Sequence, residues 1–200
     1  HFACADELDN DFTALQIDRF NQAVQALDAE RSLANSAAIL GWPAARADWV
    51  RPGYMLYGLS PFGQQHQSAH QLTPVMTFES QIIEIKQVAR GEGIGYNHAW
   101  RAQRETRIAV VAAGYGDGYP RNTKNGAPVL VQGQRAKTLG HIAMDMMMVD
   151  ISAIPSATIG SPVELWGKQL SVNEVAAYSG YSPYELLTRM PSRVATIYNR

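Results

Sequence analysis

The chain has 200 residues, 46% hydrophobic and 18% charged, and its 17 basic and 18 acidic side chains give a formal net charge of −1. This length and composition suit one large globular domain or two modest ones with an apolar core. The balanced charge, without a long block of one sign, gives no support for nucleic acid or an anionic membrane surface as a partner. No apolar run approaches the roughly 20 residues of a membrane span, and no secretory leader opens the chain.

Cys4 is the only cysteine, which excludes an internal disulfide and a cysteine-based metal site and suits a reducing, cytoplasmic compartment. The chain starts at His1 and its first methionine is Met55. We therefore expect a processed protein or a fragment of a longer one.

Two helices are predicted in the first 45 residues. Apolar residues at helical spacing predict one over about 14–28, where Thr13 followed by Gln16 resembles a capping box. Asn35 and Ser36 are good N-caps for a short second helix that Gly41 ends. The start of this second helix is either a plain cap or an anion site, because its first N–H groups are unpaired.

The stretch 49–58 predicts a short strand, a tight turn and another apolar segment. Arg51 stands at the strand end, and Gly53 either makes the turn or lets the backbone approach a ligand closely. A strand, a short helix and a strand with a glycine turn resemble the last units of a (β/α)₈ barrel, where phosphate sites commonly lie.

A domain linker is predicted over 63–73, which is polar and without periodicity. It divides the chain into a barrel part, 1–72, and a β domain, 73–200. His66 and His70 are four residues apart within it, but no acidic or cysteine partner is near, so a solvated linker is favoured over a metal site.

The second part has the pattern of an antiparallel barrel or sandwich. Strands are predicted at 75–88, 108–113, 141–151, 163–166 and 193–197, with a hairpin over 128–138 that turns at Gln132–Gly133. Two small helices are predicted after capping boxes, at Ser171 with Glu174 and at Ser182 with Glu185. Tyr184 then projects from a first helical turn, where an anion is favoured.

The stretch Ala-Gly-Tyr-Gly-Asp-Gly-Tyr-Pro-Arg at 113–121 follows the apolar strand and ends it abruptly. Tyr115 is the phenol nearest to the strand, which would suit a proton-carrying hydroxyl on a rigid support. Gly-Asp-Gly is also ordinary turn chemistry, and tyrosines often edge a core with the hydroxyl in water. This stretch alone leaves both interpretations open.

Six blocks, in the same order, resemble the alanine racemase family of fold-type III pyridoxal phosphate enzymes. They include Ala-Asn-Ser-Ala-Ala at 34–38 and Arg-Pro-Gly-Tyr at 51–54, and they occupy 1–7, 34–38, 50–61, 114–121, 140–146 and 160–167. The resemblance implies an α/β plus all-β fold: the C-terminal part of a (β/α)₈ TIM-type barrel, followed by a mainly antiparallel β domain. It implies interconversion of L- and D-alanine.

The resemblance also implies roles for single residues. Tyr115 matches the catalytic tyrosine, which exchanges the α-proton on one face of the substrate. Arg51 matches the arginine at the pyridine nitrogen, and His1 matches the histidine that lies near it and helps to orient the partner subunit's tyrosine. The groups that hold the cofactor phosphate are matched by Ser36, Gly53, Tyr54 and Tyr184. Met144 matches a backbone contact to the substrate carboxylate, with Asp145 beside it.

The chemistry agrees with this assignment. Racemisation needs proton-transfer groups on opposite faces of a planar carbanion, whose charge pyridoxal phosphate delocalises. A tyrosine titrates near 10 in water, so its use as a base at neutral pH requires a positive neighbour. An arginine at the ring nitrogen stays protonated and weakens the electron sink, which limits side reactions.

The resemblance exposes a gap. The family's Schiff-base lysine, its second base, lies upstream of the segment that matches His1, and no lysine here stands in a matching motif: Lys86, Lys124, Lys137 and Lys168. We expect the isolated chain to be inactive. We also expect a homodimer with a composite site, and poor solubility of the free half-barrel because it exposes apolar strand edges.

Two alternatives remain. One is a broader racemase, for instance for serine or lysine, on the same scaffold. The other is a non-catalytic binding or oligomerisation module derived from the family. For an alanine racemase, both D-alanine biosynthesis for peptidoglycan precursors and alanine breakdown remain open.

Overall fold

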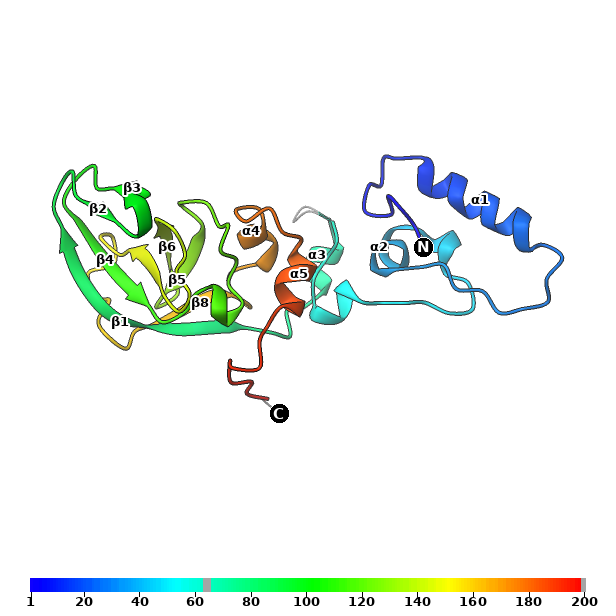
Figure 1. Cartoon of the computed structure of the whole chain (residues 1–200). Helices are drawn as coiled ribbons and strands as arrows, with labels where there is room; N and C mark the ends of the chain where they lie inside the picture. Colours follow the sequence, from blue (N-terminus) through cyan, green and yellow to red (C-terminus); the bar gives the residue numbers. More distant parts are fainter. Residues whose placement is uncertain (63–65, 199–200) are drawn as a thin grey trace. The chain divides into compact units, whose positions relative to one another are not determined.

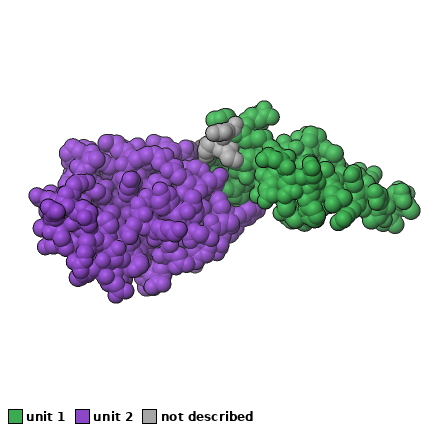
Figure 2. Space-filling model, turned by 90° about the horizontal axis from the view of Figure 1, so that it is seen from above, with its two compact units in different colours: residues 1–75 green, residues 76–200 purple. Residues whose placement is uncertain are grey.

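The computed structural model describes residues 1–62 and 66–198. The chain divides into two compact units, His1–Val75 and Met76–Arg200 (Figure 2). This division falls close to the boundary predicted between residues 72 and 73. Within the described residues, no helix is long and apolar enough to cross a bilayer.

Unit 1 consists of short helices and loops. It contains α1 (Phe12–Val24), α2 (Ser36–Gly41), η1 (Pro43–Ala45), η2 (Tyr54–Tyr57) and α3 (Ser68–Gln71). Its small core is built from the buried side chains of Phe2, Ala5, Ile17, Leu33, Ala34, Ala37, Ala38, Ala45 and Phe62. The alanines of this core are small, so α2 packs closely against its neighbours, and burying them costs no side-chain entropy.

The described part of unit 1 has no strand, and the strand predicted before Arg51 is wrong. Only an isolated parallel bridge joins Ser32 and Trp49. Extended backbone needs a paired neighbour for its N–H and C=O groups, and a single bridge does not extend into a ladder. The expected exposed strand edges are therefore missing here, although the side chains of Leu27, Trp49 and Leu56 are at least 60% exposed.

The first helix, predicted over about 14–28, differs at both ends, since α1 spans Phe12–Val24. It begins at Phe12 after Asp11, whose side chain makes no capping bond. The capping box is wrong because Thr13 is buried inside the helix and the Gln16 Oε1 accepts the Ala3 N–H at 3.0 Å. The second helix is confirmed, with the Asn35 Oδ1 accepting the Ala38 N–H.

The predicted linker is not wholly solvated. Residues 63–65 lie outside the described residues, but α3 follows within the same stretch. Its first residue, Ser68, is buried, and its hydroxyl lies 2.7 Å from the Ser60 Oγ and 2.8 Å from the His66 Nδ1. These contacts give the polar side chains partners inside unit 1.

Unit 2 contains a closed antiparallel barrel, seen at the left of Figure 1. Its strands are β1 (Phe78–Val88), β4 (Thr106–Val111), β5 (Pro128–Val131), β6 (Gln134–Leu139), β7 (Met147–Asp150) and β8 (Pro162–Trp166), in the order β1-β4-β7-β6-β5-β8. The strands β2 (Gly93–Ile94) and β3 (Trp100–Arg101), with η3 (Tyr96–His98) between them, form a separate small sheet. Its Ile94 and Trp100 pack against a buried cluster that includes residues of β1, β4 and β6. Closure leaves the barrel without a free edge.

Local patterns explain most of the barrel. Its strands carry fully buried side chains, among them Ile82, Val111, Val129, Met147, Leu165 and Trp166. The predicted hairpin is confirmed: Gln132 (φ 51°) and Gly133 (φ 74°) both have left-handed backbone, as the tight turn between β5 and β6 requires. Register shifts in β1, next to Phe78 and between Ile82 and Glu84, let this strand pair with both β4 and β8.

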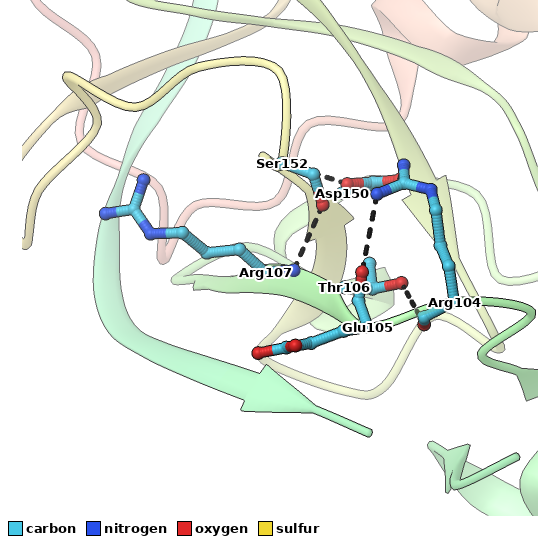
Figure 3. A network of polar contacts seen from close by, with 6 residues as sticks. All are labelled: Arg104, Glu105, Thr106, Arg107, Asp150 and Ser152. Atoms are coloured by element: carbon cyan, nitrogen blue, oxygen red, sulfur yellow. Dashed lines mark hydrogen bonds and ion pairs between the residues drawn. The ribbon is translucent and has the colours of Figure 1, made fainter. Parts of the chain in front are cut away.

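Polar contacts join the start of β4 to the end of β7 (Figure 3). The Ser152 Oγ accepts the Arg107 N–H at 3.0 Å, and the Asp150 Oδ1 accepts the Ser152 N–H at 2.9 Å. The Asp150 Oδ2 lies 3.3 Å from an Arg104 nitrogen. These contacts fix the turn after β7 on the side of the barrel where β4 begins.

Two of the predicted strands are wrong in part or in whole. Residues 141–146 form a turn before β7, in which the Ala143 N–H donates to the Met146 O at 3.0 Å. Residues 193–197 form no strand, and the Val194 N–H donates a hydrogen bond to the Pro191 O within a turn. The two small helices are confirmed as α4 (Val172–Ala176) after Ser171 and α5 (Pro183–Thr188) after Ser182.

Candidate active site

In unit 1, Ser36 connects the start of α2 to the turn at residues 53–55. Its buried hydroxyl oxygen accepts the N–H of Gly53 at 3.0 Å and that of Met55 at 3.2 Å. Ser36 is the first residue of α2, and Gly53 precedes η2, whose first residue is Tyr54. The start of α2 and the turn at residues 53–55 are therefore joined through one oxygen atom.

Arg51 is anchored by main-chain and side-chain oxygens of residues 32 and 33. One terminal guanidinium nitrogen donates to the Ser32 O (2.8 Å) and the Ser32 Oγ (2.6 Å), and the other donates to the Leu33 O (3.3 Å). The Arg51 N–H also donates to the Ala34 O at 2.8 Å. The side chain is thus a fixed, permanently charged donor.

His1 lies against Arg51. Its Nδ1 is 3.3 Å from an Arg51 guanidinium nitrogen, and its Nε2 is 3.5 Å from the Asn35 Nδ2. Both neighbouring groups can only donate, and a neutral imidazole accepts through one nitrogen, so the tautomer of His1 decides which of the two it binds. His1 thus lies between Arg51 and the N-cap of α2.

In unit 2, Tyr115 begins the single turn η4 (Tyr115–Asp117), which follows the end of β4 at Val111 after three intervening residues. Its N–H donates to the Ala143 O at 3.0 Å, and the Gly116 N–H donates to the Met144 O at 2.7 Å. The predicted substrate-contacting residues Met144 and Asp145 therefore lie beside the predicted catalytic tyrosine. The same two bonds explain why residues 141–146 do not extend β7.

This close approach depends on glycine. A Cβ atom on Gly114 would lie 2.3 Å from the Ala143 O and 2.5 Å from the Met144 C, both main-chain atoms. Such distances do not occur between real Cβ atoms and their neighbours. Gly114 thus lets the Tyr115 turn and the Met144 loop lie in contact.

The two phenols of the turn have opposite surroundings. The Tyr115 side chain is 40% exposed, and the Arg121 guanidinium carbon lies 5.9 Å from its ring centroid, within the range of a cation–π contact. Tyr119 is buried and stacks on Trp166 with ring centroids 5.9 Å apart. Burial raises the pKa of the Tyr119 phenol far above its ordinary value, so this group stays neutral.

The structure brings the predicted residues together as two clusters, one in each unit. Unit 1 holds His1, Ser36, Arg51, Gly53 and Tyr54, and unit 2 holds Tyr115, Met144 and Asp145. Tyr184 lies in the first turn of α5 in unit 2 and is 39% exposed. Within the described residues, no group of three or more His, Cys, Asp or Glu side chains could hold a metal ion.

Sequence reasoning missed three residues of these clusters. Ser32 binds Arg51, and Asp117 and Arg193 form an ion pair at the Tyr115 turn, with 3.1 Å between the Arg193 Nε and the Asp117 Oδ1. Asp117 was visible only as part of a Gly-Asp-Gly turn. Arg193 lies in a predicted strand, and no pattern near it indicates that its partner is Asp117, far earlier in the chain.

Comparison with known proteins identifies the family. Residues 1–61 match the family model for the alanine racemase N-terminal domain, and residues 75–198 match the model for the alanine racemase C-terminal domain. The chain belongs to the alanine racemase family. This membership and the solved structures below confirm the predicted fold class.

Relatives in this family are close in sequence. The alanine racemase of Pseudomonas taetrolens is 52% identical over 194 residues, which cover 96% of this chain and 54% of the relative. The catabolic alanine racemase of Pseudomonas putida is 51% identical with the same coverage. The chain thus spans about half the length of the curated relatives it matches.

Solved structures of alanine racemases match over the whole chain. The biosynthetic enzyme from Pseudomonas aeruginosa has a TM-score of 0.95 and 48% identity, and the match covers 100% of this chain and 56% of that one. The enzyme from Bartonella henselae, which contains covalently bound pyridoxal phosphate, has a TM-score of 0.90 and 29% identity, with coverages of 100% and 55%.

Proposed function

We propose that this chain is the C-terminal part of a pyridoxal phosphate-dependent alanine racemase, which interconverts L- and D-alanine. Tyr115 exchanges the α-proton on one face of the substrate. The observation that carries the proposal is the pairing of the Tyr115 turn with the Met144 loop through two backbone hydrogen bonds, within a chain of this family. A tyrosine held by main-chain bonds on a closed barrel is a precisely oriented proton-transfer group.

The residues of unit 1 fit pyridoxal phosphate. The anchored Arg51 guanidinium suits a ring nitrogen that stays unprotonated, because arginine donates a hydrogen bond without giving up its proton. Ser36, Gly53 and Tyr54 form a compact polar cluster suited to the phosphate, with Tyr184 as a further contact. When bound, the cofactor delocalises the negative charge that forms at the substrate α-carbon.

Other residues of the chain orient the cofactor-binding arginine and bind the substrate. His1 holds the Arg51 guanidinium from one side, at 3.3 Å. The Met144 backbone and Asp145 contact the substrate carboxylate next to Tyr115. Arg121 lies beside Tyr115, with its guanidinium carbon 5.9 Å from the ring centroid, within the range of a cation–π contact.

The second base is a lysine supplied by a segment N-terminal to the part of the family that this chain matches. The four lysines of this chain all belong to unit 2 or its loops: Lys86, Lys124, Lys137 and Lys168. We further propose that the full-length protein works in the cytoplasm as a homodimer, in which one subunit's Tyr115 and Met144 meet the other's Arg51 and Ser36. The candidate residues form two clusters, one in each unit, which supports this arrangement.

The test is racemisation of L- and D-alanine by full-length protein and by its Tyr115→Phe variant. We expect a loss of kcat of at least about 100-fold on removal of the hydroxyl, since general acid–base catalysis contributes that much. The isolated 200-residue chain should be inactive. Parental rates for Tyr115→Phe in both directions would favour a non-catalytic module instead, and equal kcat/KM for serine or lysine in a substrate panel would favour a broader racemase.

A further inference from the structure

The Tyr115 turn has a second support besides the Met144 loop. The segment that follows α5 packs against it: a Cβ atom on Gly118 would lie 3.1 Å from the Met190 Sδ and 3.2 Å from the Pro191 Cδ. On the other side of the turn, a Cβ atom on Gly116 would lie 3.1 Å from an Arg193 guanidinium nitrogen. The C-terminal segment therefore lies directly on η4.

Asp117 connects the turn to this segment with both of its carboxylate oxygens. Its Oδ2 accepts the Gly114 N–H at 2.9 Å, which closes the start of η4. Its Oδ1 lies 3.1 Å from the Arg193 Nε. The Asp117 side chain is only 14% exposed, whereas the Arg193 side chain is 51% exposed and reaches it from outside.

We propose that Asp117 and Arg193 are positioning residues for Tyr115. The pair holds η4 between the Met144 loop and the C-terminal segment, so that the Tyr115 phenol is presented in one orientation. This rests on the proposed function of Tyr115. The Tyr115 ring is partly exposed, so the fixed turn beneath it decides where its hydroxyl points.

The variants are Arg193→Gln, Arg193→Lys and Asp117→Asn in the full-length, cofactor-loaded protein. We expect Arg193→Gln and Asp117→Asn to lower kcat for alanine by about ten- to a hundredfold, because a reacting group displaced by about 1 Å loses that much. KM should change by less than about twofold, since the loss is confined to the transition state. Arg193→Lys keeps the charge and should recover part of kcat.

The matched control is Arg135→Gln, because Arg135 makes a comparable pair with Glu174. That pair joins β6 to α4, with both terminal guanidinium nitrogens on the carboxylate, and neither residue belongs to η4 or to the segment after α5. It should cost the protein similar stability and leave kcat unchanged.

Two readouts separate positioning from a merely structural role. With α-deuterated alanine, the primary isotope effect on kcat/KM should grow in Arg193→Gln only in the direction in which Tyr115 takes the proton. Without cofactor, amide hydrogen exchange in residues 114–119 should be faster in Arg193→Gln than in the parent, and unchanged in Arg135→Gln.

The outcomes are distinguishable. If Tyr115→Phe retains parental activity, the proposed function itself fails. If Tyr115→Phe is inactive but Arg193→Gln and Asp117→Asn behave like Arg135→Gln in kcat and isotope effect, only the positioning role is overturned.

Discussion

The two units fix their candidate site residues by different means. In unit 1 the anchors are side chains: the Ser36 hydroxyl binds two backbone N–H groups, and the Arg51 guanidinium binds backbone carbonyls. In unit 2, η4 is held mainly by backbone groups, because it is bonded to residues 143 and 144 through main-chain atoms on a closed barrel, and the Asp117–Arg193 pair adds a side-chain contact. Unit 1 should therefore be sensitive to the loss of single polar groups, and unit 2 to changes of volume in its core.

The largest effect is expected from the core of unit 2. Trp166 is 1% exposed and packs against Phe78, with ring centroids 4.8 Å apart. Trp166→Ala should lower the free energy of unfolding of unit 2 by about 3–5 kcal/mol, since a large buried side chain leaves a cavity. Chemical denaturation of the full-length protein measures this loss. Amide exchange in residues 32–58 should keep its parental protection.

Trp166→Phe is the matched control for this prediction. The Trp166 Nε1 is buried and has no hydrogen-bond partner among the described residues. Phenylalanine removes that donor and keeps most of the ring, so its cost should be well below that of alanine. An alanine variant as stable as the parent would contradict the dependence of unit 2 on its core.

A smaller, local effect is expected in unit 1. Ser36→Ala leaves the N–H groups of Gly53 and Met55 without their acceptor, which should cost about 1–3 kcal/mol. Hydrogen exchange at residues 53–57 and the affinity of the full-length protein for pyridoxal phosphate measure it. Both should weaken, while unit 2 keeps its stability.

Ser182→Ala is the control in the other unit. Its hydroxyl accepts one N–H group, that of Glu185 at 3.1 Å, at the start of α5. We expect a cost of about 1 kcal/mol from the lost cap and no change of exchange at residues 53–57. Equal effects of both serine variants on residues 53–57 would contradict the anchoring role of Ser36.

The smallest effect at neutral pH is expected from Tyr119→Phe. The Tyr119 hydroxyl is buried without a partner among the described residues, so its removal should leave the free energy of unfolding unchanged or raise it by up to about 1 kcal/mol. At high pH the difference should grow in favour of phenylalanine.

The sign follows from the raised pKa of Tyr119 in the folded state, which burial causes. The folded protein keeps a proton that the unfolded chain releases above a pH of about 10. The contribution of Tyr119 to stability is therefore complete below that pH and is lost as the pH rises toward the folded pKa. Urea denaturation between pH 8 and pH 11 should show a steeper decline in the parent than in Tyr119→Phe, and parallel curves would contradict this.

Local sequence signals predicted the elements that local interactions form. Asn35 caps α2, Gln132 and Gly133 turn the hairpin, and Ser182 caps α5, each through contacts within a few residues. The strands predicted at 141–146 and 193–197 do not form. The backbone carbonyls of residues 143 and 144 and the side chain of Arg193 instead bind η4. These contacts join residues up to 76 positions apart, so no local sequence pattern predicts them.

Contacts between residues far apart in the sequence also limit how much of the site can be predicted. Tyr115, Arg51 and Ser36 were found because each lies in a short block that resembles the family. Asp117 binds the backbone of Gly114, the neighbour of Tyr115, and Ser32 binds Arg51 itself. A glycine-flanked aspartate or a lone serine has many equivalent explanations in a sequence.

The closure of the barrel by its first and last strands has a consequence for the order of folding. Phe78 pairs with Trp166, so β1 must wait for most of unit 2 to be synthesised before its second neighbour exists. Until then, a growing chain exposes β1 with one unpaired side, and pairing over so long a loop is slow. Chaperone capture of nascent chains should thus be strongest before β8 leaves the ribosome and should end once residue 166 has emerged.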